Sequence, residues 1–542
     1  MGSLFVSRCR VLAILLLFSM VSLPVFAKDA KGIVFHDANG NGAFDKGEPG
    51  LPDVPVSNGQ EVVLTNEKGR FSLSVSRDCN IFVIKPSGWQ FHLNEGTRTA
   101  KSYYTHKPDG APELKVPGLE PTGPLPRDLQ FGLVEHDESG AFEMLAFGDT
   151  QPRDQQEIDY ISHDVVEELL DTDAELGVVL GDIVFENLAD LSSLAHSVGN
   201  IPVPWYYVIG NHDLNFDVTD RKYTDEAYER VFGPANYAFN FGKVHFIVFN
   251  NVAWDVSKRE YHAEIGQEQM AFIENDLKHV PKDRLIVFMM HIPLMDVVDK
   301  DKLFDLLKDY PHTFSMSAHW HRQSHFFLDQ THGWAQPNPH HHLVQGTVCG
   351  GWWTGGYDEL GIPHATMSDG VPNGYSFVTF KDNEYSVRYK VSRRPADYQM
   401  NIHTPELLKQ ADLAATPVIV NVFSGSARDT VRMRVDGGDW QGLAQFSGED
   451  PYVAQGKARE GALATLIAKG EGVANPDEEA QKKIINQNRA VTGRSLPGPR
   501  ETDHLWKAML PAGLNAGYHV VEVEWTDQFG QVSTDKRIFR VE

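Results

Sequence analysis

Short apolar runs that end in polar side chains dominate the hydrophobic pattern in the middle of this 542-residue chain. The clearest run is Trp205–Ile209, which is followed directly by Gly210, Asn211, His212 and Asp213. Consecutive apolar, β-branched and aromatic residues over this length are typical of a fully buried parallel strand. Open α/β sheets bind ligands at the carboxyl ends of their strands, so the polar residues after Gly210 indicate a ligand site.

Four further stretches repeat this design in order along the chain: Glu143–Gln151, Leu176–Val184, Leu285–Pro293 and Thr313–His321. Between the first two, Asp154–Leu170 carries apolar residues at helical spacing. The same spacing predicts helices over Gly266–Val280 and Lys302–Lys308. A strand–helix–strand unit joins parallel strands by a right-handed crossover. The alternation therefore predicts an α/β fold whose sheet is covered on both faces.

Towards both ends of the chain the pattern changes to short alternating runs separated by Gly, Pro, Asn and Asp, which is typical of β-sandwiches. The strands predicted before the central part are Gly32–Phe35, Glu61–Leu64, Phe71–Val75 and Ile81–Ile84. Those predicted after it are Val418–Phe423, Val431–Val435, His519–Trp525 and Ile538–Val541. Residues 92–138, rich in Pro and Gly, are predicted to be a connection with at most two strands. The polar stretch Gly470–Arg500 is predicted to be an insertion.

The first 27 residues differ from the rest of the chain. Arg8 and Arg10 precede an apolar run, and Val25–Ala27 offers a small-residue cleavage site. This is the pattern of a secretory signal peptide, and the run is too short for a good membrane span. We therefore expect an exported protein, periplasmic or extracellular. The predicted domains are a signal peptide (1–27), an amino-terminal β-sandwich (28–135), a central catalytic domain (139–395) and a carboxyl-terminal β-sandwich (396–542).

The chain is acidic, with a formal net charge of −25. Removing the leader deletes two arginines and no acidic residue, which gives −25 − 2 = −27. Such a charge argues against a nucleic-acid polymer as partner, because the phosphate backbone is repelled, but it is compatible with a small phosphate ester held by metal ions. The mature chain keeps only Cys79 and Cys349, which could pair but are too few for a disulfide framework or a cysteine-ligated zinc site.

Carboxylates, amides and imidazoles stand at or near the ends of the five predicted central strands. They are Asp149, Gln151, Asp182, Asn211, His291, His319 and His321. This donor set suits Mn²⁺, Fe²⁺ or Zn²⁺ rather than a thiolate-bound metal. Two such ions about 3.5–4 Å apart can lower the pKa of a bridging water and stabilise both the attacking and the leaving oxygens of an in-line displacement.

The motifs that carry these residues, in order, resemble those of the calcineurin-like metallophosphoesterases: Gly148–Gln151, Gly181-Asp182, Gly210–Asp213, His291 and His319–His321. The resemblance implies a four-layer α/β/β/α sandwich, here flanked by two all-β domains as in an exported bacterial subgroup. It also assigns the ligands of two divalent ions: Asp149, Gln151 and His321 to one, Asn211, His291 and His319 to the other, and Asp182 to both.

The same resemblance gives His212 a catalytic role, because it follows Asn211 and would point into the site without being a ligand. We expect His212 to stabilise the transition state and to deliver a proton to the leaving oxygen, with Asp213 as its orienting partner. Where the family usually has His, this chain has Gln151, whose neutral amide oxygen is a weaker and harder ligand and favours Mn²⁺ or Mg²⁺ over Fe³⁺. Glu186 is predicted to be either a supporting contact or a solvated side chain.

The loop Asp37–Glu48 matches the pattern D-x-N-x-N-G-x₅-E of a twelve-residue calcium loop. Its predicted calcium ligands are Asp37, Asn39, Asn41, Asp45 and Glu48. The string from Gly32 to Ser57 resembles the B-repeat domains of bacterial surface adhesins, which implies Ca²⁺ in the amino-terminal domain. The alternative interpretation is a polar turn without an ion.

Trp352 and Trp353 lie between glycines and are predicted either to stack on substrate or to fill a domain junction. His340–His342 are predicted to form a surface run, with further metal ligands or substrate contacts as the alternative. The leading function is an exported dinuclear-metal phosphoesterase acting on a small-molecule or envelope phosphate ester, a diester more than a monoester, by attack of a metal-bridging hydroxide. The alternative is a catalytically inactive, adhesin-like binding protein on the same fold. Contact with a cell surface or glycan through the β domains is compatible with either.

Overall fold

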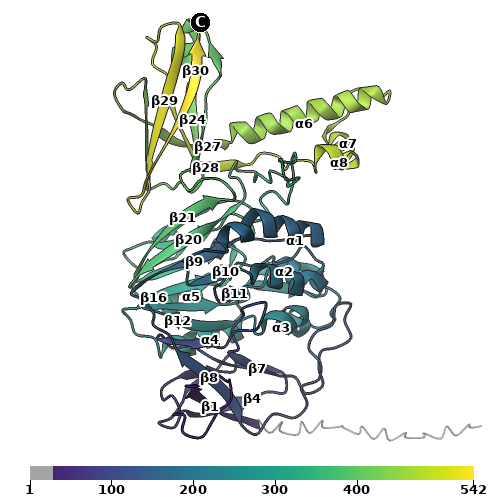
Figure 1. The fold of residues 1–542 in the computed structure, drawn as a ribbon, viewed down its shortest axis with the longest axis vertical. Helices are drawn as coiled ribbons and strands as arrows, with labels where there is room; N and C mark the ends of the chain where they lie inside the picture. Colours follow the sequence, from purple (N-terminus) through teal and green to yellow (C-terminus); the bar gives the residue numbers. More distant parts are fainter. Residues whose placement is uncertain (1–27) are drawn as a thin grey trace, which may run out of the picture.

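The computed structural model describes residues 28–542, which form three parts arranged along the long axis of the molecule (Figure 1). The amino-terminal strands lie at one end, the carboxyl-terminal strands at the other, and the mixed helices and strands between them. The predicted signal peptide, residues 1–27, lies outside the described residues. Within residues 28–542, no helix is long and apolar enough to cross a membrane.

The amino-terminal part consists of two four-stranded sheets, ordered β4-β1-β8-β6 and β3-β2-β5-β7. The strands are β1 (Lys28–His36), β2 (Pro55–Ser57), β3 (Val62–Leu64), β4 (Arg70–Val75), β5 (Cys79–Val83), β6 (Trp89–Phe91), β7 (Tyr103–His106) and β8 (Leu129–Glu135). Phe71, Leu73 and Val75 alternate with more exposed residues along β4 and are buried between the sheets. The four predicted strands are confirmed, and residues 92–138 supply β7 and β8.

The central part contains two large sheets and a two-stranded hairpin, β14-β15 (Val252–Asp255 and Glu260–Ala263). The first is ordered β11-β10-β9-β20-β21, and β9, β10 and β11 are parallel. Its strands are β9 (Ala141–Phe147), β10 (Leu176–Val179), β11 (Trp205–Tyr207), β20 (Gly374–Lys381) and β21 (Glu384–Val391). The second sheet is ordered β12-β13-β16-β17-β19-β18. Its strands are β12 (Tyr237–Phe241), β13 (Val244–Val248), β16 (Leu285–Met289), β17 (Thr313–Ser317), β18 (Ser324–Leu328) and β19 (His340–Val344), and β13, β16, β17 and β19 are parallel.

The two central sheets face each other, and helices cover their outer faces (Figure 1). Met144 and Ala146 of β9 belong to the apolar cluster between the sheets, whereas Leu145 and Phe147 belong to the cluster that includes the helices. The covering helices are α1 (Gln155–Ile161), α2 (Leu191–Val198), α3 (Glu226–Phe232), α4 (Gln267–Leu277) and α5 (Lys300–Leu307). This is the four-layer sandwich that the resemblance implied. Each sheet is therefore covered on both faces: helices cover its outer face, and the second sheet covers its inner face.

The carboxyl-terminal part again packs two sheets, ordered β22-β24-β28-β27 and β23-β30-β29-β25-β26. The strands are β22 (Met400–His403), β23 (Leu407–Leu408), β24 (Pro417–Val422), β25 (Thr430–Val435), β26 (Gln441–Gly442), β27 (Ala444–Glu449), β28 (Glu501–Met509), β29 (Gly517–Thr526) and β30 (Val532–Val541). The four strands predicted from the sequence are confirmed as β24, β25, β29 and β30.

A helical insertion, residues 451–500, separates β27 from β28 and contains α6 (Pro451–Gly470), α7 (Glu478–Gln487) and α8 (Arg489–Thr492). The sequence analysis began this insertion too late, at Gly470. The helix begins earlier because the buried Asp450 side chain accepts a hydrogen bond from the Val453 amide and Pro451 occupies the first turn. In Figure 1, α7 and α8 lie on the side of the molecule where α1 covers the first central sheet.

Candidate metal centre

The predicted metal ligands meet at the carboxyl ends of the parallel strands of the two facing central sheets. Asp149 follows β9, Asp182 follows β10, Asn211 follows β11, His291 follows β16, and His319 and His321 follow β17. All of these side chains except His319 are buried, and His319 is half-buried. The structure therefore brings together residues that are up to 172 positions apart in the sequence (321 − 149 = 172).

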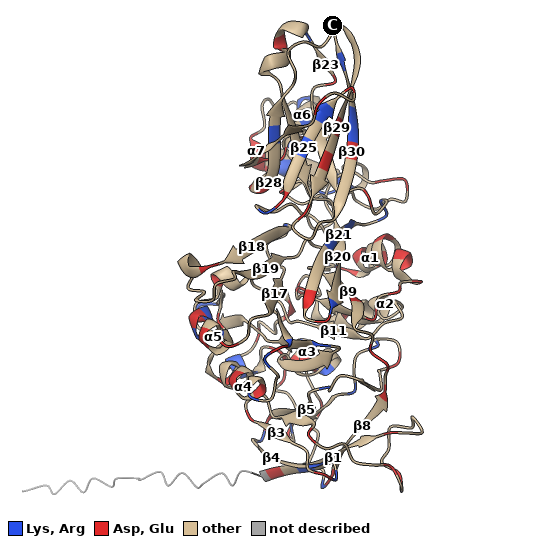
Figure 2. Cartoon of the chain, turned by 90° about the vertical axis from the view of Figure 1, so that its left-hand side faces the viewer, with Lys and Arg blue, Asp and Glu red and all other residues tan. Residues whose placement is uncertain are grey.

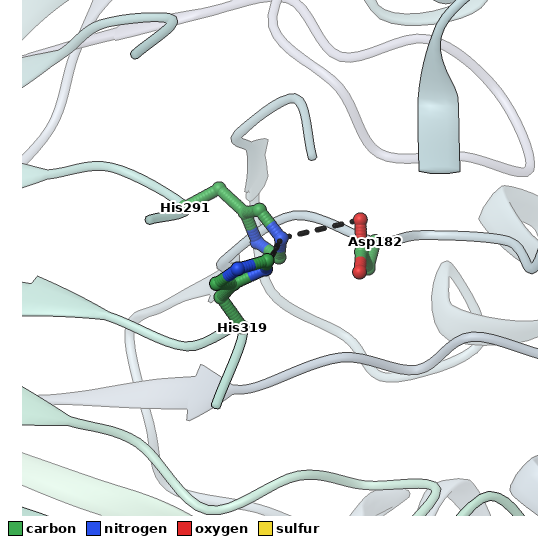
Figure 3. A group of neighbouring side chains, drawn as sticks. All are labelled: Asp182, His291 and His319. Atoms are coloured by element: carbon green, nitrogen blue, oxygen red, sulfur yellow. Dashed lines mark hydrogen bonds and ion pairs between the residues drawn. The ribbon is translucent and has the colours of Figure 1, made fainter. Parts of the chain in front are cut away.

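One group of contacts is centred on His291 (Figure 3). Its Nε2 lies 3.2 Å from Asp182 Oδ1, 3.0 Å from Asn211 Oδ1 and 3.2 Å from His319 Nδ1. The other ring nitrogen, Nδ1, donates to the Leu180 carbonyl at 2.9 Å, which directs Nε2 towards the side chains of Asp182, Asn211 and His319. One donor atom from each of Asp182, His291 and His319 lies within 4.8 Å of the others, a spacing that suits one shared cation.

The second group is centred on Asp149. Its Oδ2 lies 3.2 Å from His321 Nε2, and His321 Nδ1 donates to the Gly350 carbonyl at 2.9 Å. Asp149 Oδ2 is buried and has no hydrogen-bond partner among the described residues, an arrangement that is costly for a carboxylate oxygen. A cation would satisfy it, so the residues of this group fit a metal ion.

Gln151 also lies in this second group, beside Asp182. Its Nε2 donates to Asp182 Oδ2 at 3.1 Å, and its Oε1 lies 3.9 Å from the buried thiol of Cys349. Ligation of an ion through the amide oxygen would therefore require the Gln151 carboxamide to flip, so that Oε1 rather than Nε2 faces Asp182. Cys349 also lies 3.9 Å from His321 Nδ1, so a thiol that the sequence analysis did not place in the site borders it.

Burial and mutual repulsion determine the charge of these groups. Burial raises the pKa of Asp149 to about 8, with the Asp182 charge acting in the same direction. Burial lowers the pKa of His321 to about 4 and, together with the charge of His291, lowers that of His319 to about 3. For His291, burial lowers the pKa, but the charges of Asp182 and Asp149 outweigh it and raise the pKa to about 9. Buried carboxylates within reach of three imidazoles, all with strongly shifted pKa values, are typical of a functional site, and they supply the ligand types of a metal site.

Left-handed backbone is concentrated among the candidate ligands. Positive φ angles occur at Gln151 (38°), Asp182 (46°), His319 (68°) and His321 (49°). Non-glycine residues adopt this conformation at a cost, and such strain is concentrated at functional sites. Glycines allow the close approach of the strand ends: a Cβ on Gly210 would lie 2.0 Å from the Asp182 amide nitrogen, and one on Gly181 would lie 2.5 Å from His291 Nδ1.

The His212 ring borders the centre, with its amide donating to Asp182 Oδ1 at 2.9 Å. Asp213 does not orient it, and this prediction is corrected. Both Asp213 oxygens accept hydrogen bonds from backbone amides, those of Ile183, Val184 and Gly210, so this carboxylate holds two strand ends together. The carboxylate that faces His212 is that of Glu186, whose Oε1 lies 3.7 Å from Nδ1, while Phe185 stacks on the ring.

The two tryptophans take different positions. Trp352 is half-buried, and its ring stacks on His321 with centroids 4.0 Å apart. Trp353 is 1% exposed and packs into the central core against Tyr160, so its predicted contact with substrate is wrong. The chain turns in left-handed conformation at both residues, which directs the two rings to different environments.

Three further findings correct or extend the sequence analysis. His340, His341 and His342 are buried in β19, not on the surface, and they hydrogen-bond to partners that include Ser315, Ser317 and Tyr385. Cys79 and Cys349 are free thiols. Tyr261, in the hairpin of β14 (Val252–Asp255) and β15 (Glu260–Ala263), packs edge-on to His319 at 6.0 Å, and no sequence signal pointed to it.

The predicted calcium loop is a compact polar turn in the amino-terminal part. Asp45 Oδ2 accepts from the amide groups of Asn39 and Asn41 at 2.9 and 2.8 Å. Glu48 accepts from the backbone amides of Ala38 and Asp45. Asp37 accepts from three amides of the turn and lies 2.6 Å from His92 Nε2. The five predicted ligands are therefore close together and already engaged with one another or with the backbone.

Comparison with known protein families gives three matches along the chain. Residues 143–323 match the calcineurin-like phosphoesterase family, residues 38–115 match the N terminal of calcineurin-like phosphoesterase, and residues 341–480 and 468–532 match its C terminal. The comparison with curated proteins gives no significant match.

Among solved structures, similarity is found to purple acid phosphatase PPD1 from yellow lupin (Lupinus luteus) seeds. It is 13% identical, covers 63% of this chain and 67% of that chain, and has a TM-score of 0.33. Vacuolar Protein Sorting 29 from Cryptosporidium parvum is 12% identical, with a TM-score of 0.21, and the match covers 47% of this chain and 98% of that chain.

Proposed function

Because this chain belongs to the calcineurin-like phosphoesterases, a family of metal-dependent phosphoester hydrolases, we propose that it hydrolyses a phosphate ester at a dinuclear metal centre. The observation that carries the proposal is the convergence of buried carboxylates and imidazoles around Asp149 and His291. The unpartnered Oδ2 of Asp149 supports it most directly, since a buried carboxylate oxygen requires a donor or a cation.

We assign Asp149, Gln151 and His321 to one ion, Asn211, His291 and His319 to the other, and Asp182 to both. The contacts of Asp182 support a shared role, because one of its oxygens faces His291 and the other faces Gln151. When bound, such ions polarise a phosphoryl oxygen and lower the pKa of water. Leu180 and Gly350 hold His291 and His321 in the tautomer that presents Nε2 as a ligand.

We further propose that His212 delivers a proton to the leaving oxygen. Stacking on Phe185 and the amide contact with Asp182 fix the ring at the edge of the centre. Glu186, which is exposed and faces Nδ1 at 3.7 Å, would orient the ring. Asp213 would act only by holding the loop.

A metal reconstitution experiment tests the proposed hydrolysis. The mature chain is stripped of metal and supplied separately with Mn²⁺, Zn²⁺, Fe²⁺ or Mg²⁺, and hydrolysis of a chromogenic phosphodiester and its monoester is followed. We expect metal-dependent turnover, with the diester favoured. Asp182→Asn should lower kcat by about 10²-fold or more, as expected when charge stabilisation at a reacting centre is lost.

The alternative, an inactive binding protein on the same fold, predicts a different outcome. It requires ligand binding that survives Asp182→Asn and a wild-type chain that turns over neither ester with any metal. The number of metal ions bound per chain distinguishes the hydrolase from the inactive binding protein, since about two ions per chain support a dinuclear hydrolase. A stoichiometry near zero would contradict it.

We also propose that the chain is exported and acts on an envelope or other small phosphate ester rather than on a nucleic-acid polymer. The pattern of residues 1–27 and the acidic mature chain support both points. Expression of the full chain in a bacterium should give a mature product that begins after Ala27, measured by intact mass. A cytosolic, uncleaved product would contradict export.

A further inference from the structure

A basic cavity of about 350 Å³ lies between the catalytic domain and the helical insertion. Arg153 and Trp352 form its wall on the catalytic side. Lys482 and Asn486 of α7, Arg489 of α8 and the following Arg494 form the opposite wall. This volume lies at the small end of ligand pockets and is large enough for a phosphate and the groups next to it.

The charge of this cavity is opposite to that of the protein. Four of its lining side chains are basic and none is acidic, whereas the chain carries −25 overall. In Figure 2, acidic residues, coloured red, occur on α1, α4 and α5, which are among the helices that cover the catalytic sheets. A local group of cations in an acidic protein attracts anions to this one position.

Most of the positive charge in the cavity is not neutralised. Among residues 28–542, Glu157 is the only carboxylate paired with the group, and it lies 3.2 Å from Arg153 and 3.5 Å from Arg494. Lys482 and Arg489 are exposed and form no ion pair with any residue of the described chain. One carboxylate among four cations leaves a formal charge of +3.

The cavity shares its walls with the metal centre. Trp352 forms one wall, and its ring also stacks on the candidate ligand His321. Arg153 donates to the Trp352 carbonyl at 2.9 Å, and its guanidinium lies 4.5 Å from the centroid of Phe185, the ring that stacks on His212. Trp352 adopts a left-handed φ of 59°, and strain of this kind is concentrated at ligand sites.

We propose that this cavity is a specificity subsite that binds a second phosphate group of the substrate, beyond the ester that is cleaved. The proposal rests on the proposed hydrolysis and narrows the substrate to an ester bearing another phosphate. Arginine guanidinium groups bind phosphate with two parallel hydrogen bonds, and the lysine adds a mobile charge. Because these contacts exist before and during the reaction, their loss acts on KM more than on kcat.

A direct binding measurement tests the subsite without depending on turnover. Alkane-α,ω-bisphosphonates with spacers of increasing length are titrated calorimetrically into the Mn²⁺-loaded mature chain, each beside the alkylphosphonate of the same length. We expect one spacer range in which the bisphosphonate binds about tenfold tighter or more, the gain that one or two charged hydrogen bonds provide. The matched alkylphosphonate shows whether the apolar chain alone produces the gain.

Variants of the insertion locate the effect. Lys482→Gln combined with Arg489→Gln should abolish the bisphosphonate advantage, and Arg489→Glu alone should weaken it. Lys483→Gln, on the same helix and exposed but outside the cavity wall, should retain it. The proposal is overturned if no spacer gives an advantage, or if the advantage persists in the double variant. Failure of metal-dependent ester hydrolysis with this advantage intact would instead overturn the proposed function and leave the subsite standing.

Discussion

Both flanking domains pack two β-sheets around an apolar core, yet they meet the catalytic domain through different contacts. The amino-terminal domain uses buried ion pairs. Lys107 Nζ lies 2.6 Å from Glu226 of α3. Lys85 pairs with Glu138 of the connecting segment, and Glu138 in turn accepts from the Gly242 amide of the catalytic domain. The carboxyl-terminal domain extends a helical insertion whose basic side chains form one wall of a cavity beside the metal centre. The comparison suggests that the first domain supports the catalytic fold and that the second adds to its recognition of substrate.

The largest expected effect removes the main ion pair of the amino-terminal interface. Lys107→Met leaves Glu226, which is 0% exposed, without its cation, and should lower the free energy of unfolding by about 3–5 kcal/mol. Chemical denaturation of the mature chain measures this loss. The values of kcat and KM at a temperature where the variant is folded should stay near those of the wild type, since the pair does not contact the metal centre.

Arg77→Met is the matched control for this variant. Arg77 pairs with Asp109 in the same domain, but both side chains are largely exposed. Such a pair contributes about 0–1 kcal/mol. An equal loss of unfolding free energy in the two variants would contradict the supporting role of the amino-terminal domain. A large change in KM with Lys107→Met would contradict the assignment of substrate recognition to the carboxyl-terminal domain alone.

A smaller effect is expected where the insertion joins the carboxyl-terminal sheets. The buried Asp450 caps α6 through the Val453 amide and accepts from Asn421 Nδ2 at 2.8 Å. Asp450→Ala should therefore cost about 1–3 kcal/mol of unfolding free energy. Because α7 and α8 follow α6, the same variant should also weaken bisphosphonate binding, which the calorimetric titration measures.

Asp450→Asn provides the control, because Asn is as good a helix cap as Asp. It should retain most of the stability and most of the bisphosphonate binding. If Asp450→Ala lowers the stability but leaves bisphosphonate binding unchanged, the cavity does not depend on the Asp450 cap. The proposed role of the carboxyl-terminal domain in recognition would then have less support.

The sequence pattern predicted the catalytic layers well because each strand that leads to the centre is a short apolar run with its polar residues directly behind it. Trp205–Ile209 and the residues after Gly210 are the clearest case, since fold and site are encoded in one continuous stretch. The π-helical turn that follows α1 did not prevent recognition of that helix, because the apolar spacing of Asp154–Leu170 persists through it.

Residues that reach the site from elsewhere in the chain could not be predicted in this way. Tyr261 and Arg489 are single residues without periodicity, and only the tertiary fold brings Tyr261 to the metal centre and Arg489 to the cavity. Glu186 was predicted to be a supporting contact or a solvated side chain, and only the fold shows that it faces His212. The start of α6 did carry a local signal, a capping Asp followed by Pro, but the glycines within the helix concealed it. Contact with substrate and packing in a domain junction stayed open for Trp352 and Trp353, because the sequence does not show on which side of a strained turn a ring lies.

The smallest effect concerns calcium in the amino-terminal domain, and it tests whether that domain has a ligand of its own. If the Asp37–Glu48 loop binds Ca²⁺, extracellular modules of this type suggest a dissociation constant of about 10⁻⁴–10⁻³ M. Calorimetric titration of the mature Asp182→Asn chain should then show one calcium site that Glu48→Gln abolishes and that Glu67→Gln, an exposed carboxylate outside the loop, retains. Because the loop belongs to the domain that adds nothing to the cavity, calcium should leave ester hydrolysis by the wild-type chain unchanged. Binding that survives Glu48→Gln would assign the ion elsewhere and leave the loop as a polar turn, whose hydrogen bonds to Asp45 already close it.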